Sequence, residues 1–215
     1  MVSEKRSDKL LHEILWKENL DLAQASLSHP FVKGIADGTL NEKSFRTYVA
    51  QDAFFLRAFR KAYALAIAKC DDLDKAKIFH KLMGGVLEEL NLHKSYSAKL
   101  GIDLEKVEPL PECKAYTDFL LRVAWQNDVS EIVAAMAPCM ILYAFVGREL
   151  AANFNPKTKY IDWIKTYASK EIQELAREME NLLDSVCEGS KGIFNNYRYA
   201  MKLEVAFFGE PLGEY

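Results

Sequence analysis

The sequence has little proline and glycine, and most of these residues fall at breaks between apolar segments. It contains 6 prolines and 10 glycines in 215 residues. No segment alternates apolar and polar residues between turn residues, as a half-exposed β-strand would. There is also no internal repeat, no low-complexity run and no stretch that resembles a linker. These absences favour an all-α protein in which residues 1–215 form a single domain.

An excess of charge of one sign is also missing. The net charge is -3 and the isoelectric point is about 5.9. The chain therefore lacks the basic character of nucleic-acid binding proteins. The first twenty residues, MVSEKRSDKLLHEILWKENL, carry charges in every turn. We therefore expect neither a signal peptide nor a transmembrane helix there. The cysteines form no C-x-x-C pair and no zinc-binding spacing, so we expect reduced thiols in a cytoplasmic protein. The four are Cys70, Cys113, Cys139 and Cys187.

Apolar residues recur at helical spacing along nearly the whole chain. The predicted helices cover residues of about 8–28, 39–70, 72–100, 112–126, 130–153, 157–168, 170–187 and 191–208. The segment SHPFVKGIADGTL, between the first two, is expected to be a short turn-rich passage. Capping-box patterns, in which a small polar residue precedes an acid by three positions, begin at Thr39 and Asp128. Seven or eight amphipathic helices with short connections predict a helical bundle.

Two acidic residues interrupt stripes that are otherwise apolar. Asp52 lies within the stripe Phe45, Tyr48, Val49, Phe55, Leu56, Phe59 and Tyr63, and Glu204 lies within Ile193, Tyr197, Ala200 and Phe207. Burying a carboxyl group costs free energy unless it finds a partner. Taken alone, Asp52 is better explained as a solvated acid or one paired with Arg57 or Arg60. Two inward-facing acids on different helices favour a shared polar cavity.

The segment SEIVAAMAPCMILYAFVGREL, residues 130–150, has a proline inside a helical pattern. A proline there removes one backbone hydrogen bond and costs about 3 kcal/mol. We expect Pro138 to bend the helix and to widen the interior around Cys139. Tyr143 lies four residues further on and faces the same way. An inert cysteine that packs as a small hydrophobe is the alternative, with about equal weight. The other three cysteines have no comparable setting and are expected to be structural.

The sequence also contains candidate metal ligands and aromatic residues that could line a pocket. Glu89 and His93 lie four residues apart on one helix, like half of a carboxylate-bridged di-iron site, but the sequence has no second Glu/His motif. An ordinary i,i+4 pair is therefore the preferred interpretation. Tyr116 and Tyr167 lie on apolar faces, where tyrosine usually packs. The same side chains would also suit the lining of a pocket for a flat heteroaromatic ligand.

Five segments, taken in order, resemble the TenA family (thiaminase II, or aminopyrimidine aminohydrolase), and the resemblance covers nearly the whole chain. The segments are HPFVKGIADGTL at 29–40, FRTYVAQDAFFL at 45–56, SEIVAAMAPCMILYAFVG at 130–147, YIDWIKTYAS at 160–169 and KLEVAFFG at 202–209. The set in this order is specific, whereas any single segment is not. The Pro-Cys pair resembles the branch of the family that carries a catalytic thiol. The resemblance implies a haem-oxygenase-like all-α fold that needs no haem.

The same resemblance implies a set of site residues. Cys139 matches the family's nucleophile, and Glu204 is the candidate acid/base. The implied substrate-binding residues are Asp52, Phe55, Tyr116, Tyr143 and Tyr167. Other members can carry tyrosine at the position of Phe55. Phenylalanine keeps the stacking surface there and loses a hydroxyl contact.

The activity implied by the resemblance is hydrolysis of the bond between the 5-methylene carbon of an aminopyrimidine and a leaving nitrogen, without a metal or organic cofactor. The substrate is thiamine or 4-amino-5-aminomethyl-2-methylpyrimidine, and the product is hydroxymethylpyrimidine. We favour the degraded pyrimidine, because destroying intact thiamine is an odd task for a cytoplasmic enzyme. A metal-dependent oxidase on the same fold and a non-catalytic binding or regulatory module remain alternatives. Family members are commonly homotetramers, and we expect Trp16 and Trp163 to be exposed at subunit contacts.

Overall fold

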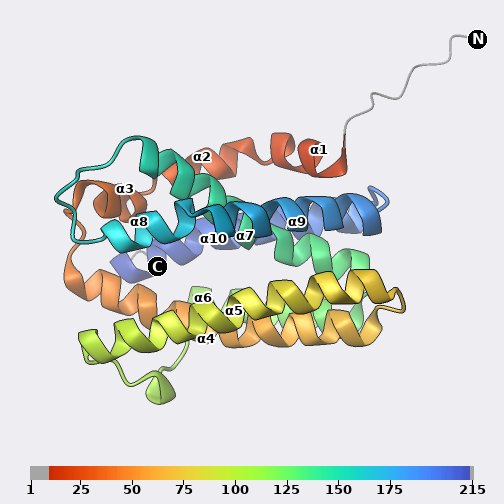
Figure 1. Ribbon diagram of the computed structural model, residues 1–215, viewed down its shortest axis with the longest axis horizontal. Helices are drawn as coiled ribbons and strands as arrows, with labels where there is room; N and C mark the ends of the chain where they lie inside the picture. The colour runs from red at the N-terminus through yellow and green to blue at the C-terminus, as the bar shows by residue number, and fades with distance from the viewer. Residues whose placement is uncertain (1–9, 214–215) are drawn as a thin grey trace, which may run out of the picture.

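The computed structural model describes residues 10–213, without the side chains of residues 92, 95, 96 and 99. These residues form helices and no strand, which confirms the prediction of an all-α protein (Figure 1). The α-helices are α1 (Leu11–Glu18), α2 (Leu20–Ser28), α3 (Pro30–Asp37), α4 (Glu42–Lys69), α5 (Leu73–Leu100), α6 (Pro111–Gln126), α7 (Val129–Ala152), α8 (Ile161–Ala168), α9 (Lys170–Val186) and α10 (Lys191–Gly209). Two short 3-10 helices, η1 (Leu104–Lys106) and η2 (Glu210–Leu212), complete the description.

The region before α4 is more helical than the sequence predicted. The expected first helix is divided at Asn19, whose side-chain amide donates to the Leu15 carbonyl at 2.8 Å. The passage expected to be a turn forms α3. Pro30 occupies its first turn, where a missing N–H costs nothing, and His29 caps it by accepting from the backbone N–H of the second residue. Gly38 ends the helix with a φ of 79°, a conformation that favours glycine.

Side-chain caps define where the two central helices begin. The long helix α4 starts after Asn41, whose side-chain oxygen accepts the Ser44 N–H at 2.7 Å. The capping box predicted at Thr39 is therefore wrong. For α7, the Asp128 side chain accepts the Glu131 N–H at 3.0 Å, as its capping pattern predicted. Each cap satisfies a backbone donor that has no partner within the helix.

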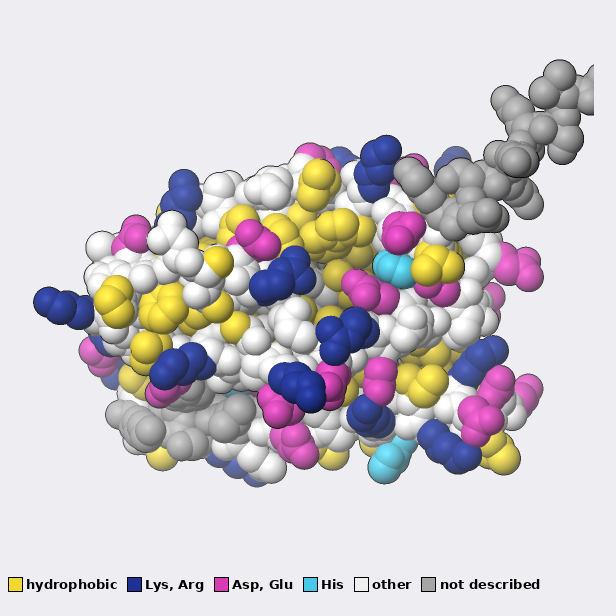
Figure 2. Space-filling model, turned by 45° about the horizontal axis from the view of Figure 1, so that its top comes forward, with side chains coloured by type: hydrophobic (Ala, Val, Ile, Leu, Met, Phe, Trp, Pro, Cys, Tyr) yellow, Lys and Arg dark blue, Asp and Glu magenta, His cyan; other side chains and the backbone are white. Residues whose placement is uncertain are grey.

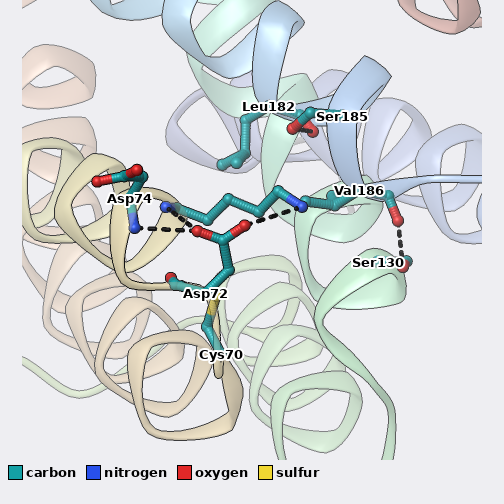
Figure 3. A network of polar contacts seen from close by, with 8 residues as sticks. Cys70, Asp72, Asp74, Ser130, Leu182, Ser185 and Val186 are labelled. Carbon is teal, nitrogen blue, oxygen red and sulfur yellow. Dashed lines mark hydrogen bonds and ion pairs between the residues drawn. The ribbon is translucent and has the colours of Figure 1, made fainter.

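Polar contacts also fix the ends of helices to one another. Asp72 caps α5 by accepting the backbone N–H groups of Asp74 and Lys75 at 2.9 and 3.1 Å (Figure 3). The Ser130 hydroxyl donates to the Val186 carbonyl at 2.5 Å, which joins the beginning of α7 to the end of α9 (Figure 3). Helices α4 and α5 lie side by side, and α7 packs against α8, α9 and α10 (Figure 1).

Helix α7 is the central core helix, and it continues through Pro138. Within residues 10–213 it is the one helix long and apolar enough to cross a membrane, and 72% of its most apolar window is buried inside the protein. Gly147 allows α8 to approach it closely. A Cβ atom at this position would lie 2.4 Å from the backbone carbonyl carbon of Tyr167. The glycine therefore determines how near Tyr167 comes to the interior.

Candidate active site

A small cavity in the centre of the bundle brings together the residues that the sequence singled out. One compartment is lined by Asp52, Phe55, Tyr116, Cys139, Tyr143, Glu204 and Phe207. A second shares Asp52, Cys139 and Tyr143, and adds Glu89 from α5 and Tyr167 from α8. All seven predicted site residues therefore line two adjacent compartments that share three residues. They come from α4, α6, α7, α8 and α10.

Aromatic side chains nearly fill this cavity. The two compartments hold about 10 and 30 Å³, and an adjoining one lined by Glu89, His93 and Tyr167 holds about 20 Å³. About 10 to 15 Å³ of such space is enough room for one water molecule. A six-membered ring can therefore enter only if the aromatic side chains move apart.

The carboxyl group of Glu204 contacts both the thiol and a tyrosine. The Tyr116 hydroxyl donates to Glu204 Oε1 at 2.6 Å, and Cys139 lines the same compartment beside this carboxyl group. Burial, followed by the nearby charge of Asp52, raises the pKa of Glu204 to about 8, and the hydrogen bonds of Tyr116 and Cys139 offset only part of this rise. Glu204 therefore holds a proton in most molecules at pH 7, and it can exchange that proton near neutrality.

The thiol of Cys139 is protonated in the free site. Burial raises the pKa of Cys139 well above its ordinary value, and the negative charges of Glu204, Glu89 and Asp52 raise it further. Because only a thiolate is strongly nucleophilic, a neighbouring base must accept the proton before Cys139 can attack. Glu204 lines the same compartment as the thiol, and its carboxylate form is able to accept a proton there.

The other three cysteines lie outside the cavity. Cys113 and Cys187 are buried, and their thiols contact the backbone carbonyl groups of Gln51 and Ser130 at 3.4 and 3.3 Å. Burial raises the pKa of Cys187 to about 12. Cys70 is half-buried at the corner between α4 and α5. None of the three contacts a side-chain carboxyl group in the way that Cys139 contacts Glu204.

Asp52 pairs with a histidine and not with an arginine. Its Oδ2 lies 2.7 Å from Nε2 of His93, and each side chain is 7% exposed. Arg57 pairs instead with Glu105 at 3.0 Å, and Arg60 is exposed. Both arginines that sequence reasoning offered as partners of Asp52 are therefore wrong, as is the alternative of a solvated acid.

His93 carries a positive charge in this setting. Its Nδ1 lies 3.0 Å from the backbone carbonyl of Glu89, which can only accept a hydrogen bond, so Nδ1 is protonated. Burial alone lowers the pKa of His93. The hydrogen bond and charge of Asp52, together with the charge of Glu89, outweigh burial and raise this pKa to about 9. The Asp52–His93 contact is thus a buried ion pair at pH 7.

Glu89 and His93 turn to different partners rather than to a common point. The Tyr167 hydroxyl donates to Glu89 Oε1 at 2.6 Å. Burial and then the charge of Asp52 raise the pKa of Glu89 to about 7. Within residues 10–213, no group of three or more His, Cys, Asp and Glu side chains is arranged to hold a metal ion. This geometry is that of a hydrogen-bond network and not of half a di-iron site.

Comparison with known proteins gives the family. A model of the TENA/THI-4/PQQC family matches residues 16–208. The chain belongs to this family. It is 35% identical over 201 residues to an aminopyrimidine aminohydrolase of Halalkalibacterium halodurans, a match that covers 90% of this chain and 87% of the relative.

Solved structures agree with this membership of the TENA/THI-4/PQQC family. A TenA family transcription regulator from a Silicibacter species superposes with a TM-score of 0.88 at 29% identity, over 93% of this chain and 95% of that one. A haem oxygenase-1 from Synechocystis, in complex with haem, gives a TM-score of 0.59 at 15% identity over 95% and 93% of the two chains. At this identity the second likeness concerns the fold alone, and it agrees with the predicted haem-oxygenase-like bundle.

Around the site, aromatic rings that pack at tilted angles form the walls. Phe55 lies 4.7 Å from Tyr116, and Tyr143 lies 4.8 Å from Tyr167, measured between ring centroids. Trp163, predicted to be exposed at a subunit contact, is 5% exposed and packs against Tyr167 at 4.6 Å. That prediction is wrong, because α8 turns this side chain inward against α7.

The sequence did not predict that Glu89 and His93 belong to the hydrogen-bond network of the site. It indicated them only as an i,i+4 pair or half of a metal site, and it did not predict that His93 pairs with Asp52. The signal available was charge balance. A buried acid on α4 requires a buried cation, and His93 is the histidine that lies on the apolar face of the neighbouring predicted helix, four residues from Glu89.

Proposed function

We propose that this protein is a hydrolase of thiamine salvage, an aminopyrimidine aminohydrolase that uses Cys139 as its nucleophile. The observation that carries the proposal is that a thiol, a carboxyl group beside it and a second carboxylate held in an ion pair line one compartment. The printed name of the Halalkalibacterium halodurans relative describes the same activity.

Substrate recognition falls to the groups that do not touch the thiol. In the proposal, the Asp52 carboxylate accepts a hydrogen bond from the exocyclic 4-amino group of the pyrimidine. Phe55 and Tyr116 offer ring faces for stacking, and Tyr143 and Tyr167 border the ring. A flat heterocycle held on one edge by a fixed acceptor and on its faces by aromatic rings is presented to Cys139 in one orientation.

The proposed chemistry begins in molecules whose Glu204 has lost its proton, and its first step is proton transfer from the Cys139 thiol to this carboxylate. The thiolate then adds to a carbon of the pyrimidine ring, so that a new S–C bond forms. Electrons of the ring push out the nitrogen on the 5-methylene carbon, and Glu204 returns the proton to this leaving amine. Covalent catalysis of this kind divides one difficult displacement into easier steps.

Water completes the reaction. It adds to the exposed methylene carbon and loses one proton, and expulsion of the Cys139 sulfur restores the aromatic ring. For the aminomethyl substrate, one water is consumed, and hydroxymethylpyrimidine and ammonia are released. These steps route no electron pair or proton through a metal or an organic cofactor.

We infer that the physiological substrate is 4-amino-5-aminomethyl-2-methylpyrimidine and not intact thiamine. The space in the cavity supports this choice. Its compartments hold about 10 to 30 Å³, so a small amine leaving group requires less displacement of side chains than a thiazolium ring does.

We further infer that the chain works as one domain in a cytoplasmic homo-oligomer, a tetramer by family resemblance. Large apolar side chains that remain exposed support association. Among them are Leu73, at 77% exposed, and Trp125, at 69%. Light scattering of the purified protein tests the tetramer directly, and a monomer at micromolar concentration contradicts it.

One assay tests the function. The same preparation is given the aminomethylpyrimidine and thiamine, and release of ammonia is compared with release of the thiazole. We expect ammonia release to be the faster reaction by kcat/KM, and we expect it to depend on Cys139. Equal, negligible turnover of both substrates would contradict the proposal.

A further inference from the structure

The buried ion pair of Asp52 and His93 has a geometry that fixes both partners. The imidazolium uses Nδ1 for the Glu89 carbonyl at 3.0 Å and Nε2 for Asp52 at 2.7 Å. A rotation of the ring would break both contacts at once. Asp52 Oδ2 is buried and accepts no aligned hydrogen bond, so the ion-pair contact with His93 at 2.7 Å is the polar contact that loss of His93 would remove from it.

We propose that His93 is a positioning residue that determines specificity. Its imidazolium holds Asp52 as an oriented carboxylate. This carboxylate accepts a hydrogen bond from an amino group of the substrate ring and disfavours an oxo group at the same position. This inference rests on the proposed function, since it concerns how that cavity selects its pyrimidine. The carboxylate oxygen Oδ2 is committed to His93, so the ligand meets the remaining oxygen. An oxo group at that point would set two acceptors against each other in a dry site.

The charges around His93 explain why a neutral side chain cannot replace the imidazolium. The groups that face His93 from the packed helices are Asp52 on α4 and Glu89 on its own helix, with Tyr167 of α8 bonded to Glu89. Beyond them, the charge of Asp52 also acts on Glu204 and on the Cys139 thiol.

Without a cation, the Asp52 carboxylate would lie among other acids with no charged partner and no contact to fix its orientation. Its free oxygen would no longer be held toward the amino group of the ring, so the preference for rings with an amino donor over rings with an oxo acceptor would decrease.

The test measures binding of two ligands to three proteins by calorimetry at pH 7. The ligands are 4-amino-5-hydroxymethyl-2-methylpyrimidine and its 4-oxo counterpart, and the proteins are the wild type, His93→Gln and the control His12→Gln. His12 is a matched control because it forms a similar histidine–carboxylate pair with Asp184 at 2.6 Å, between α1 and α9. This pair lies outside the inner cavity, by which we mean the compartments around Cys139, Glu89 and His93.

We expect the wild type to bind the amino ring at least about a hundredfold more tightly than the oxo ring, as sites built to hydrogen-bond one group reject its isostere. His93→Gln is expected to reduce this ratio to about tenfold or less, while His12→Gln keeps it. A His93→Gln protein that retains the wild-type ratio overturns the inference alone. A wild type that binds neither ring overturns the proposed function together with the inference.

A second measurement does not depend on the variant folding. Nitrogen-15 chemical shifts of the His93 ring in the wild type report its protonation state. The inference requires both ring nitrogens to carry protons at pH 7 and one proton to be lost near pH 9, in accord with the raised pKa of His93. A neutral His93 ring at pH 7 contradicts it.

Discussion

The outer hollow between α1, α7 and α9 and the inner cavity around Cys139 differ in size and in chemistry. The outer hollow holds about 600 Å³, whereas the compartments of the inner cavity hold about 10 to 30 Å³ each. Figure 2 shows the face on which α1 and α9 lie, with apolar side chains bordered by charges of both signs. Lys17, Arg148 and Arg177 line the outer hollow together with Glu13 and Glu180.

This contrast supports the inner cavity as the proposed site, because its titratable groups are buried although its volume is small. Most charged side chains that line the outer hollow are exposed, so water screens them, and Glu180 is the half-buried one whose pKa burial raises. In the inner cavity, burial raises the pKa values of Cys139 and Glu204, and a buried ion pair supplies a fixed charge beside them. Such shifted groups with specific partners are typical of catalytic sites.

The largest expected effect comes from Cys139→Ser. A serine hydroxyl is a far weaker nucleophile toward the ring, so we expect kcat for ammonia release to fall at least about a thousandfold. The matched control is Cys70→Ser, which removes a half-buried thiol outside the cavity and should leave kcat unchanged. Wild-type turnover by Cys139→Ser would show that the thiol is only packing.

Removing the proton exchange of Glu204 is expected to have the next largest effect. Glu204→Gln keeps the shape of the side chain and an oxygen for the Tyr116 hydroxyl, and we expect kcat to fall about 10²- to 10⁴-fold. In the wild type, kcat/KM should rise toward pH 8 as Glu204 loses its proton and becomes the base, in accord with its pKa of about 8. The variant should lose this rise. A rise that persists in Glu204→Gln assigns the base to another group.

A smaller effect concerns stability and pH. Burial and neighbouring charges raise the pKa of Glu204 from 4.5 to about 8, and the pKa of His93 is raised from 6.5 to about 9. Because the folded protein binds these protons more tightly than the unfolded chain, the stability they contribute is present at low pH. It is lost as the pH rises from about 4.5 to 8 for Glu204 and from 6.5 to 9 for His93.

Thermal unfolding measured at pH 6, 7.5 and 9 checks this linkage. We expect the melting temperature of the wild type to decrease toward pH 9, and we expect a shallower decrease in Glu204→Gln, which has no proton to lose. Identical pH dependence in the two proteins would mean that Glu204 is not a buried neutral acid.

The smallest effect is expected in the outer hollow. Arg177→Ala removes a charge from its lining, and we expect kcat/KM for the aminomethylpyrimidine to stay within about twofold of the wild type, as for most surface substitutions. A loss of tenfold or more would mean that the outer hollow takes part in binding, and it would remove the contrast between the two regions.

The sequence was sufficient for the all-α fold and for the convergence of Asp52, Cys139 and Glu204. An acid or a thiol with a helical apolar stripe on both sides must face the interior when that stripe is buried. Helix α3 was missed because Pro30 and Gly38 suggest a turn, although they suit the first turn and the end of a short helix equally well.

The features of the site that the sequence did not predict depend on how one helix packs against another. The pairing of Asp52 with His93 requires a particular register between α4 and α5, and local periodicity carries no information on register. The burial of Trp163 likewise depends on the close approach that Gly147 allows between α7 and α8. A glycine at such a crossing has no signature that separates it from any other helical glycine.

A crystal structure of the protein with 4-amino-5-hydroxymethyl-2-methylpyrimidine tests most directly whether Asp52, Cys139 and Glu204 surround one pyrimidine ring. We expect the ring in the inner cavity, with its amino group hydrogen-bonded to Asp52, its 5-substituent beside Glu204 and a ring carbon facing the sulfur of Cys139. A ring bound in the outer hollow against Trp16 and Phe145, or bound with the thiol directed away from it, would overturn the proposed roles of these three residues.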